Sequence, residues 1–340
     1  MTEAVIAVED VKDKRKYFLE RLPIVQDIKL REKMSVSDLI EELGKSGGFT
    51  AKKLHEAAKI LCDMLLDDDS VNFLSFPAAI LATGTRGIIK EFVKRKFFDI
   101  IITTCGSIDH DIARCWREYY HGWFEADDKE LADLEIHRLG NIFIPYENYG
   151  GIIEEITQNF LNSLYESGMR ELSTCELINH LGKYLDSCNK KEESIIWWAW
   201  KNGIKIFVPG ITDGAFGYQL WLFKQEHKDF RIDVFLDETI LDEIIYGAKR
   251  TGALIIGGGI SKHHVIWWNQ FKDGLERAVY ITTAVEWDGS LSGARTREAI
   301  SWGKISRKAS HITVEGEATI LLPLLGAYLI DKVGYRRINQ

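Results

Sequence analysis

Short apolar runs alternate with segments of helical periodicity along most of the chain, and this alternation constrains the fold more than any other feature. The apolar runs occupy 71–75, 99–104, 141–145, 204–208, 232–235, 253–256 and 278–284. Segments with helical spacing lie between and after them, at 50–68, 83–96, 150–167, 174–185, 191–202, 238–249 and 318–331. Strands separated by helices form parallel βαβ units. The sequence therefore predicts an α/β fold, a doubly wound and mostly parallel Rossmann-like sheet with helices on both faces.

The pattern predicts one large domain with a short extension at each end. Residues 1–40 mix charged runs with apolar residues and predict an N-terminal helical extension. Residues 41–333 hold the alternating elements without an internal repeat or a Pro/Gly-rich linker, so we expect a single catalytic domain. Residues 334–340 form a basic tail that we expect to be disordered.

Composition narrows the class of protein. A chain of 340 residues with 46% hydrophobic and 28% charged residues is typical of a globular protein. No apolar run reaches the length of about 18 residues that indicates a membrane span, and the first residues do not resemble a signal peptide. We therefore expect a cytoplasmic protein without membrane contact. The net charge of −8 argues against nucleic acid as a partner and is compatible with cationic partners.

The cysteines and histidines give no metal signal. The five cysteines include no Cys-x-x-Cys pair, so we expect free thiols. The nine histidines include no His-x-x-x-His pair, and we expect no metal site.

The stretch 257–304 concentrates the chemistry of the chain. A glycine run follows an apolar strand and leads directly into Lys262, His263 and His264. A second apolar strand then leads into an acidic, serine-rich loop and on to Lys304. Ligand sites of open α/β sheets lie at strand ends and in the turns after them. We therefore expect a site here, although each lysine is also compatible with a solvated surface position.

A lysine can serve as a covalent nucleophile in such a site. An amine held beside an aromatic ring and near a second cation loses its proton more readily, and a neutral amine forms Schiff bases. Lys304 follows Trp302 closely, and Lys262 would supply the second cation if the fold brings the two lysines together. The flat ring of Trp302 also suits an alkyl amine.

Four segments of this stretch resemble deoxyhypusine synthase, in the same order and at matching intervals. They are Gly-Gly-Gly-Ile-Ser-Lys-His-His, Ala-Val-Tyr-Ile-Thr-Thr-Ala, Asp-Gly-Ser-Leu-Ser-Gly-Ala and Ser-Trp-Gly-Lys-Ile. The resemblance extends from about Val71 to Lys332. The lysine of Ser-Trp-Gly-Lys carries the covalent intermediate in that family, and Lys304 occupies its position.

The resemblance implies an NAD-dependent transfer of the aminobutyl group of spermidine. The group would pass through an imine on Lys304 to a lysine of the translation initiation factor 5A precursor. The family resemblance also implies a homotetramer. Catalytic roles fall on Lys304, His263 and Lys262. Asp213, within a Thr-Asp-Gly-Ala-Phe-Gly run, is one of the implied NAD contacts, which are Thr104, Cys105, Gly106, Asp213, Thr283, Ala284, Glu317 and Ala318.

The implied amine pocket departs from the family pattern. His110 and Tyr218 stand where other members carry carboxylates, so the charge that pairs with a polyamine must come from other acids. We expect the substrate to contact Asp109, His110, Asp288, Gly289, Ser290, Glu298 and Trp302. Two alternatives stay open: transfer to a small diamine, as in homospermidine synthase, and a noncatalytic NAD-binding protein.

Overall fold

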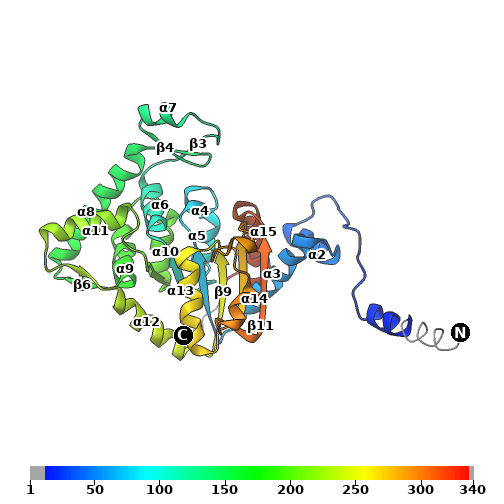
Figure 1. Cartoon of the computed structure of the whole chain (residues 1–340). Helices are drawn as coiled ribbons and strands as arrows, with labels where there is room; N and C mark the ends of the chain where they lie inside the picture. The colour runs from blue at the N-terminus through cyan, green and yellow to red at the C-terminus, as the bar shows by residue number, and fades with distance from the viewer. Residues whose placement is uncertain (1–11, 337–340) are drawn as a thin grey trace.

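The computed structural model describes residues 12–336, and a six-stranded sheet forms its centre (Figure 1). The strands are β1 (Ser70–Phe76), β2 (Ile100–Thr103), β7 (Lys205–Phe207), β9 (Arg250–Ile256), β10 (Leu275–Thr282) and β11 (Ile305–Glu315). Their spatial order is β11-β10-β9-β1-β2-β7, and every neighbouring pair is parallel. The predicted α/β fold with a mostly parallel Rossmann-like sheet is confirmed.

The direction of strand order reverses once, between β1 and β9. From β1 the chain proceeds outward to β2 and β7, and it then returns to β9 and proceeds the other way to β10 and β11. Such a reversal leaves a crevice beyond the carboxyl ends of the two central strands, where ligands of doubly wound sheets bind.

Helices cover both faces of the sheet because neighbouring strand residues point to opposite sides. On one face, Leu74 of β1 belongs to a core with α3 (Phe49–Leu65), α5 (Arg86–Lys94) and α15 (Ala318–Val333). On the other face, Phe73 packs in a second core with α12 (Val234–Gly247), α13 (Gly259–Asn269) and α14 (Thr296–Ser301).

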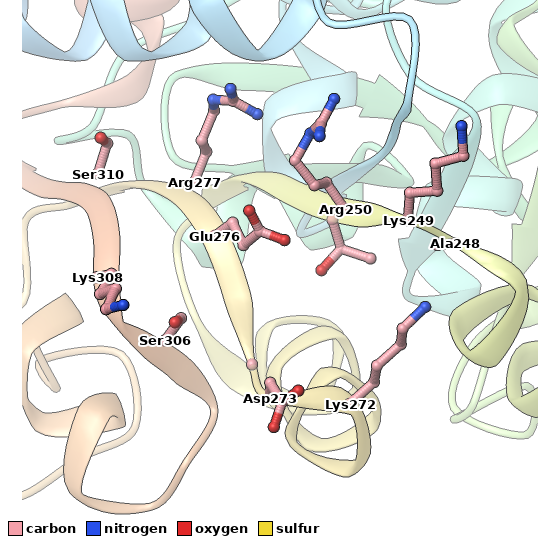
Figure 2. Close-up of a pocket in the computed structure, with 12 residues that line it drawn as sticks. Ala248, Lys249, Arg250, Lys272, Asp273, Glu276, Arg277, Ser306, Lys308 and Ser310 are labelled. Atoms are coloured by element: carbon pink, nitrogen blue, oxygen red, sulfur yellow. The ribbon is translucent and has the colours of Figure 1, made fainter.

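At the amino ends of β9, β10 and β11, basic side chains surround a hollow of about 350 Å³ (Figure 2). The arginines here have their own counter-ions. Arg250 donates to both oxygens of Asp67, at 2.6 and 2.7 Å, and Arg277 donates to Asp67 at 2.8 Å. This hollow lies at the edge opposite the crevice, and its paired arginines fasten β9 and β10 to the segment before β1.

A group of helices extends the molecule beyond β2 and β7. It consists of α6 (Cys105–Trp116), α8 (Gly150–Glu166), α9 (Thr174–Tyr184), α10 (Ile195–Asn202) and α11 (Ala215–Glu226). A two-stranded ladder of β6 (Glu171–Leu172) and β8 (Arg231–Ile232) joins their outer ends.

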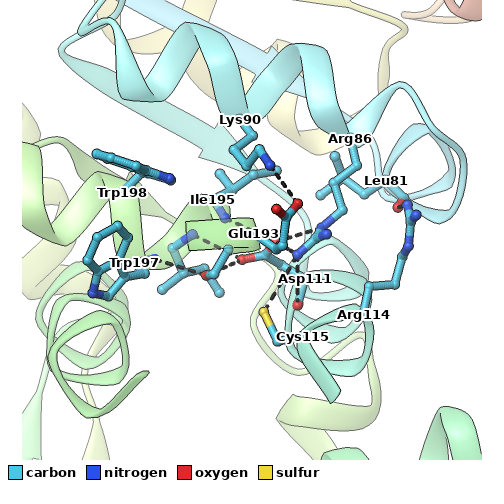
Figure 3. A network of polar contacts seen from close by, with 12 residues as sticks. Leu81, Arg86, Lys90, Asp111, Arg114, Cys115, Glu193, Ile195, Trp197 and Trp198 are labelled. Atoms are coloured by element: carbon cyan, nitrogen blue, oxygen red, sulfur yellow. Dashed lines mark hydrogen bonds and ion pairs between the residues drawn. The ribbon is translucent and has the colours of Figure 1, made fainter. Parts of the chain in front are cut away.

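The buried pair Arg86–Asp111 holds α5, α6 and α10 together (Figure 3). The Arg86 Nε donates to Asp111 at 2.9 Å. The same carboxylate accepts from the Ser194 hydroxyl at 2.7 Å and from the first two backbone N–H groups of α10. One aspartate therefore neutralises a buried arginine and caps a helix.

Two apolar runs differ from their predicted strands. Residues 141–145 contribute β5 (Ile142–Pro145), but β5 pairs with β3 (Tyr120–His121) and β4 (Ile136–Leu139) in a separate antiparallel sheet. This sheet and α7 (Asp128–Asp133) stand at the top of the molecule, away from the parallel sheet (Figure 1). In 232–235, the strand ends at Ile232, because the Asp233 carboxylate accepts from Phe235 N at 2.8 Å and starts α12.

The two ends of the catalytic domain differ from the expected boundaries. The boundary expected at 40 falls inside α2 (Val36–Lys45), and Ile40 is fully buried in the core. Residues 12–20 form a helix that stands away from the body, as Figure 1 shows. Residues 334–336 of the expected disordered tail are docked, since Arg336 donates to Asp99 at 2.7 Å. Residues 337–340 lie outside the described part.

No helix within residues 12–336 has the length and apolar character that crossing a membrane requires.

Candidate active site

The residues expected to bind NAD lie at the carboxyl edge of the parallel sheet. Thr104, Cys105 and Gly106 directly follow β2, and Asp213 lies in the loop after β7. Beyond the reversal of strand order, Thr283 and Ala284 follow β10, and Glu317 and Ala318 follow β11. The topology therefore gathers these eight residues at one edge, on both sides of the crevice.

Close packing fixes the loops on the β2 side of this edge. A Cβ on Gly106 would lie 2.9 Å from the Cβ of Ala78, and one on Gly214 would lie 2.8 Å from the Cys105 sulfur. Cys105 itself is fully buried, and burial raises the pKa of its thiol. Cys105 therefore holds the loop after β7 in place as a neutral packing group.

The glycine run before α13 fits a dinucleotide. Gly257 has φ +72 and lies against Pro77, which follows β1, so the run borders the crevice. Gly259 also has φ +72, and a Cβ there would meet nothing within 4 Å, so ligand atoms can approach the backbone. Asp213 and Glu317 are exposed carboxylates at the same edge, suited to ribose hydroxyls. This set of donors and acceptors fits NAD.

A second hollow of about 200 Å³ lies on one face of the sheet, against α13 and α14. Its walls combine residues of both helices with Tyr280 of β10 and with the loop that follows β10. They are Lys262, His263, Ile266, Tyr280, Leu291, Ala294, Arg295, Glu298, Ala299, Trp302 and Lys304. We call this hollow the lysine pocket.

Lys304 lies close to two aromatic rings, that of Trp302 in the wall of the lysine pocket and that of Trp267 on α13. Its side chain is nearly buried, with 9% of the residue exposed. The Lys304 Nζ lies 5.2 Å from the ring centre of Trp302 and 5.9 Å from that of Trp267. No carboxylate of residues 12–336 forms a salt bridge with this Nζ, so the amine keeps its hydrogen-bonding capacity for a ligand.

Lys262 supports the loop that closes the lysine pocket. Its Nζ donates to the carbonyl oxygens of Leu291 at 2.7 Å and Ala294 at 2.8 Å. Burial lowers the pKa of this ammonium to about 8, although Glu298 opposes the change. Two of its three protons are thus committed to the backbone.

His263 is the titratable group suited to proton transfer beside Lys304. Burial, and then the charge of Lys304, lower the pKa of the imidazole. The ring stacks on Trp267, with centres 5.6 Å apart, and is partly open to the pocket. A neutral imidazole can accept a proton from an attacking amine and then return it to a leaving amine. The neighbouring His264 instead faces Glu238 at 3.6 Å, and burial lowers its pKa to about 4.

The structure separates the residues expected to contact the substrate into three groups. Glu298 and Trp302 line the lysine pocket. Asp288, Gly289 and Ser290 form an exposed turn, in which Asp288 accepts from Ser290 N at 2.7 Å.

Asp109 and His110 form the third group, buried on α6. The Asp109 carboxylate accepts from Ala215 N at 2.9 Å and Phe216 N at 2.8 Å, and from the Tyr149 hydroxyl at 2.9 Å. In this chain it therefore caps α11, next to the loop of Asp213. Burial lowers the pKa of His110 to about 4, so the imidazole is neutral at pH 7.

Trp267 is the site residue that sequence reasoning missed, because a tryptophan on a helix is most often a packing residue. It lies one helical turn after His263, on the same face of α13, and its ring is 43% exposed. The spacing of four residues from a candidate acid–base group was the signal that could have identified it.

Comparisons with known proteins agree on one family. A family model described as deoxyhypusine synthase matches residues 38–329. The "Probable deoxyhypusine synthase" of Picrophilus torridus is 54% identical over 303 residues, which cover 89% of this chain and 96% of the relative. A relative of the same description from Thermoplasma acidophilum is 53% identical, over 88% of this chain and 95% of its own.

Among solved structures, the chain is similar to the one titled a putative deoxyhypusine synthase from Entamoeba histolytica. The TM-score is 0.61 at 20% identity, and the similarity covers 93% of this chain and 100% of that one. At this level of identity the likeness shows a shared fold.

Proposed function

The chain belongs to the deoxyhypusine synthase family, and on that premise we propose that it transfers the aminobutyl group of spermidine to a specific lysine of the translation initiation factor 5A precursor, with NAD as the hydride carrier. The observation that carries the proposal is the placement of Lys304. A nearly buried amine lies between two tryptophan rings, in one pocket with an imidazole of lowered pKa.

Lys304 is the nucleophile of the proposed reaction. Its neutral amine attacks the imine carbon of the oxidised donor, the carbon–nitrogen bond to diaminopropane breaks, and the four-carbon fragment stays on Lys304 as an imine. The amine of the acceptor lysine then attacks the same carbon and releases Lys304. Both attacks need a proton to be taken from the attacking nitrogen and delivered to the leaving nitrogen. His263 is placed to move that proton within the pocket.

The carboxyl edge would hold NAD, whose nicotinamide would supply the hydride chemistry that the transfer needs. Asp213 and Glu317 would hold its ribose hydroxyls, and the backbone after β9 would face its phosphates. Trp302 and Trp267 would keep water from the imine on Lys304, because hydrolysis of that bond ends the transfer.

The resemblance further implies a cytoplasmic homotetramer. Exposed aromatic rings near the pocket support an assembly, since Trp302 is 67% and Trp287 86% exposed in the single chain. Sedimentation of the purified protein measures the state directly, and a monomer at assay concentration would contradict this part of the proposal.

Product analysis tests the proposed transfer. The purified protein is incubated with NAD, labelled spermidine and the factor 5A precursor, and then with putrescine in place of the precursor. Label on one lysine of the precursor is the expected result. Label on putrescine alone would establish the homospermidine-type reaction instead. Label on neither acceptor, with NAD bound, would establish the noncatalytic alternative.

A further inference from the structure

Arg295 in the wall of the lysine pocket is a buried cation with incomplete pairing. The residue is 8% exposed, and its Nη1 has no hydrogen-bond partner within the described residues. Its nearest carboxylate, Glu315, lies 3.6 Å from Nε and is shared with Lys53, whose Nζ is 2.7 Å from the other oxygen. A buried guanidinium normally has its donors filled, because unmade bonds to a charged group are costly.

The same pocket contains a second unpaired donor. The hydroxyl of Tyr280 is buried and has no partner within residues 12–336, although the ring receives the Lys262 Nζ at 4.4 Å from its centre. Tyr280 and Arg295 come from different elements, β10 and the loop before α14, and both line the lysine pocket. Two residues of one pocket wall thus carry buried donors that lack an acceptor among the described residues.

The charges of the pocket wall also favour a bound acceptor that is negatively charged. Lys262, Arg295 and Lys304 are cationic side chains of its wall, whereas Glu298 is its one carboxylate. A polyamine adds further positive charge to this excess. A bound anion would instead offset it and would accept the two unpaired hydrogen bonds.

We propose that Arg295 and Tyr280 form a subsite for an oxyanion within the lysine pocket. The ligand group is a carboxylate or a phosphate, since both present the paired oxygens that a guanidinium recognises. A carboxylate would belong to an amine ligand whose ammonium pairs with Glu298. A phosphate would belong to the dinucleotide, because Glu315 ends β11 only two residues before Glu317 at the cofactor edge. The subsite rests on the proposed function. Its test measures ligand affinity and does not require that the aminobutyl transfer takes place.

A matched pair of probes separates the carboxylate from its amine counterpart. Aminovalerate and putrescine share a four-carbon chain and one ammonium, and they differ in the carboxylate or second ammonium at the far end. Calorimetric titration of both, and of NAD, is carried out on the wild type and on Arg295→Gln, with Arg295→Lys to keep the charge. If the subsite takes a carboxylate, Arg295→Gln weakens aminovalerate about tenfold or more and leaves putrescine unweakened.

The NAD titration distinguishes the other source. A loss of about tenfold in NAD affinity, with unchanged aminovalerate binding, would assign the oxyanion to a dinucleotide phosphate. The subsite would be overturned if Arg295→Gln bound aminovalerate as tightly as the wild type does and also bound NAD as tightly. This outcome does not depend on whether the protein transfers the aminobutyl group. Transfer with no subsite, and a subsite with no transfer, are thus separate outcomes.

Tyr280→Phe keeps the test decisive if Arg295→Gln does not fold. This change removes only the orphan hydroxyl, so the ligand-free protein should unfold at the same temperature as wild type or a higher one. The affinity for the ligand that the subsite binds, aminovalerate or NAD, should fall severalfold, so this ligand should raise the unfolding temperature of Tyr280→Phe less than that of the wild type. A ligand-free Tyr280→Phe protein that is strongly destabilised would show that the hydroxyl already has a partner, and would contradict the subsite.

Discussion

At the scale of single residues, the site depends on the different surroundings of two lysines, Lys304 and Lys262. Lys304 sits between Trp267 and Trp302 without a carboxylate partner in hydrogen-bond range among the described residues. Lys262 donates to two backbone carbonyls and so fixes the loop over the pocket. The amine of Lys304, the proposed nucleophile, is thus left available for a ligand, while Lys262 shapes the cavity.

The pH dependence of catalysis should follow His263. Burial and the charge of Lys304 both lower the pKa of the imidazole, so protonation requires a pH below the ordinary value of about 6.5. The acid limb of kcat/KM should therefore lie below that pH, with full activity retained at pH 7. His263→Gln should reduce kcat by about a hundredfold or more. An exposed histidine on the peripheral sheet, His137, supplies the control His137→Gln.

A pH profile of both variants checks this assignment. An acid limb above pH 7 in the wild type, or wild-type kcat in His263→Gln, would remove His263 from proton transfer.

The sequence predicted the residues of the lysine pocket only where a motif marked them. Lys304, Trp302, His263 and Glu298 stand within or beside the recognised segments, and the structure brings them together. Trp267 stands outside these segments, and Arg295 was passed over although it directly follows one, because an aromatic residue on a helix and an arginine in a loop are common in any fold. Their role depends on the crossing of α13 and α14, which a one-dimensional pattern does not specify.

At the scale of elements, α6 fixes two other helices next to the carboxyl edge of the sheet, where the proposed NAD contacts lie. Its Asp109 caps α11 and its Asp111 caps α10, so two carboxylates one turn or less apart orient two different helices. Buried carboxylates that each accept several N–H bonds are structural anchors as well as charges.

Removing either partner of the Arg86–Asp111 pair should destabilise the fold strongly. Arg86→Met leaves a buried carboxylate without its cation, at a cost of about 3 to 5 kcal/mol. Asp111→Ala should lower the free energy of unfolding by more, because it removes the cap of α10 and also leaves the buried Arg86 guanidinium without a carboxylate. Urea unfolding measures both free energies. Losses below about 0.5 kcal/mol, typical of surface positions, would contradict the anchoring role.

The prediction of elements succeeded for strands that are buried in the sheet. It failed where a strand's exposure or its choice of partner strand determines the structure. The strands of the sheet centre, such as β1 and β9, are buried along almost their whole length, and their apolar runs were recognised. Strand β11 was missed, because it is an edge strand whose start is polar and exposed, from Ser306 to Ser310. The run 141–145 was recognised as a strand, but local pattern does not reveal which sheet a strand joins.

At the scale of the whole molecule, the strand order places the residues proposed for nucleotide binding and those proposed for amine chemistry on one connected surface. The cofactor edge follows the carboxyl ends of β2, β7, β10 and β11, and the lysine pocket lies on the face between α13 and α14. The loop after β10 belongs to both, since it begins with Thr283 and reaches Arg295.

The docked C-terminal segment is fastened to the residue that precedes β2. The Arg336 Nη1 donates to Asp99 at 2.7 Å, and Asp99 also accepts from Asn72 N at 2.8 Å. Truncation after Val333 should therefore lower the free energy of unfolding by about 1 to 3 kcal/mol, since it leaves the half-buried Asp99 carboxylate short of its charged donor. Chemical denaturation of the truncated chain measures this. Arg307→Ala, at an exposed arginine of β11, is the control, and an equal loss in both would contradict docking.

The most direct test of the central claim is covalent trapping on Lys304. The protein turns over labelled spermidine with NAD, and borohydride is added to reduce any imine to a stable amine. Lys304→Arg keeps the positive charge but forms no imine, and Lys308→Arg makes the same change at an exposed lysine. The account predicts label on the peptide of Lys304 in wild type and in Lys308→Arg, and none in Lys304→Arg. Equal labelling of Lys304→Arg would contradict it.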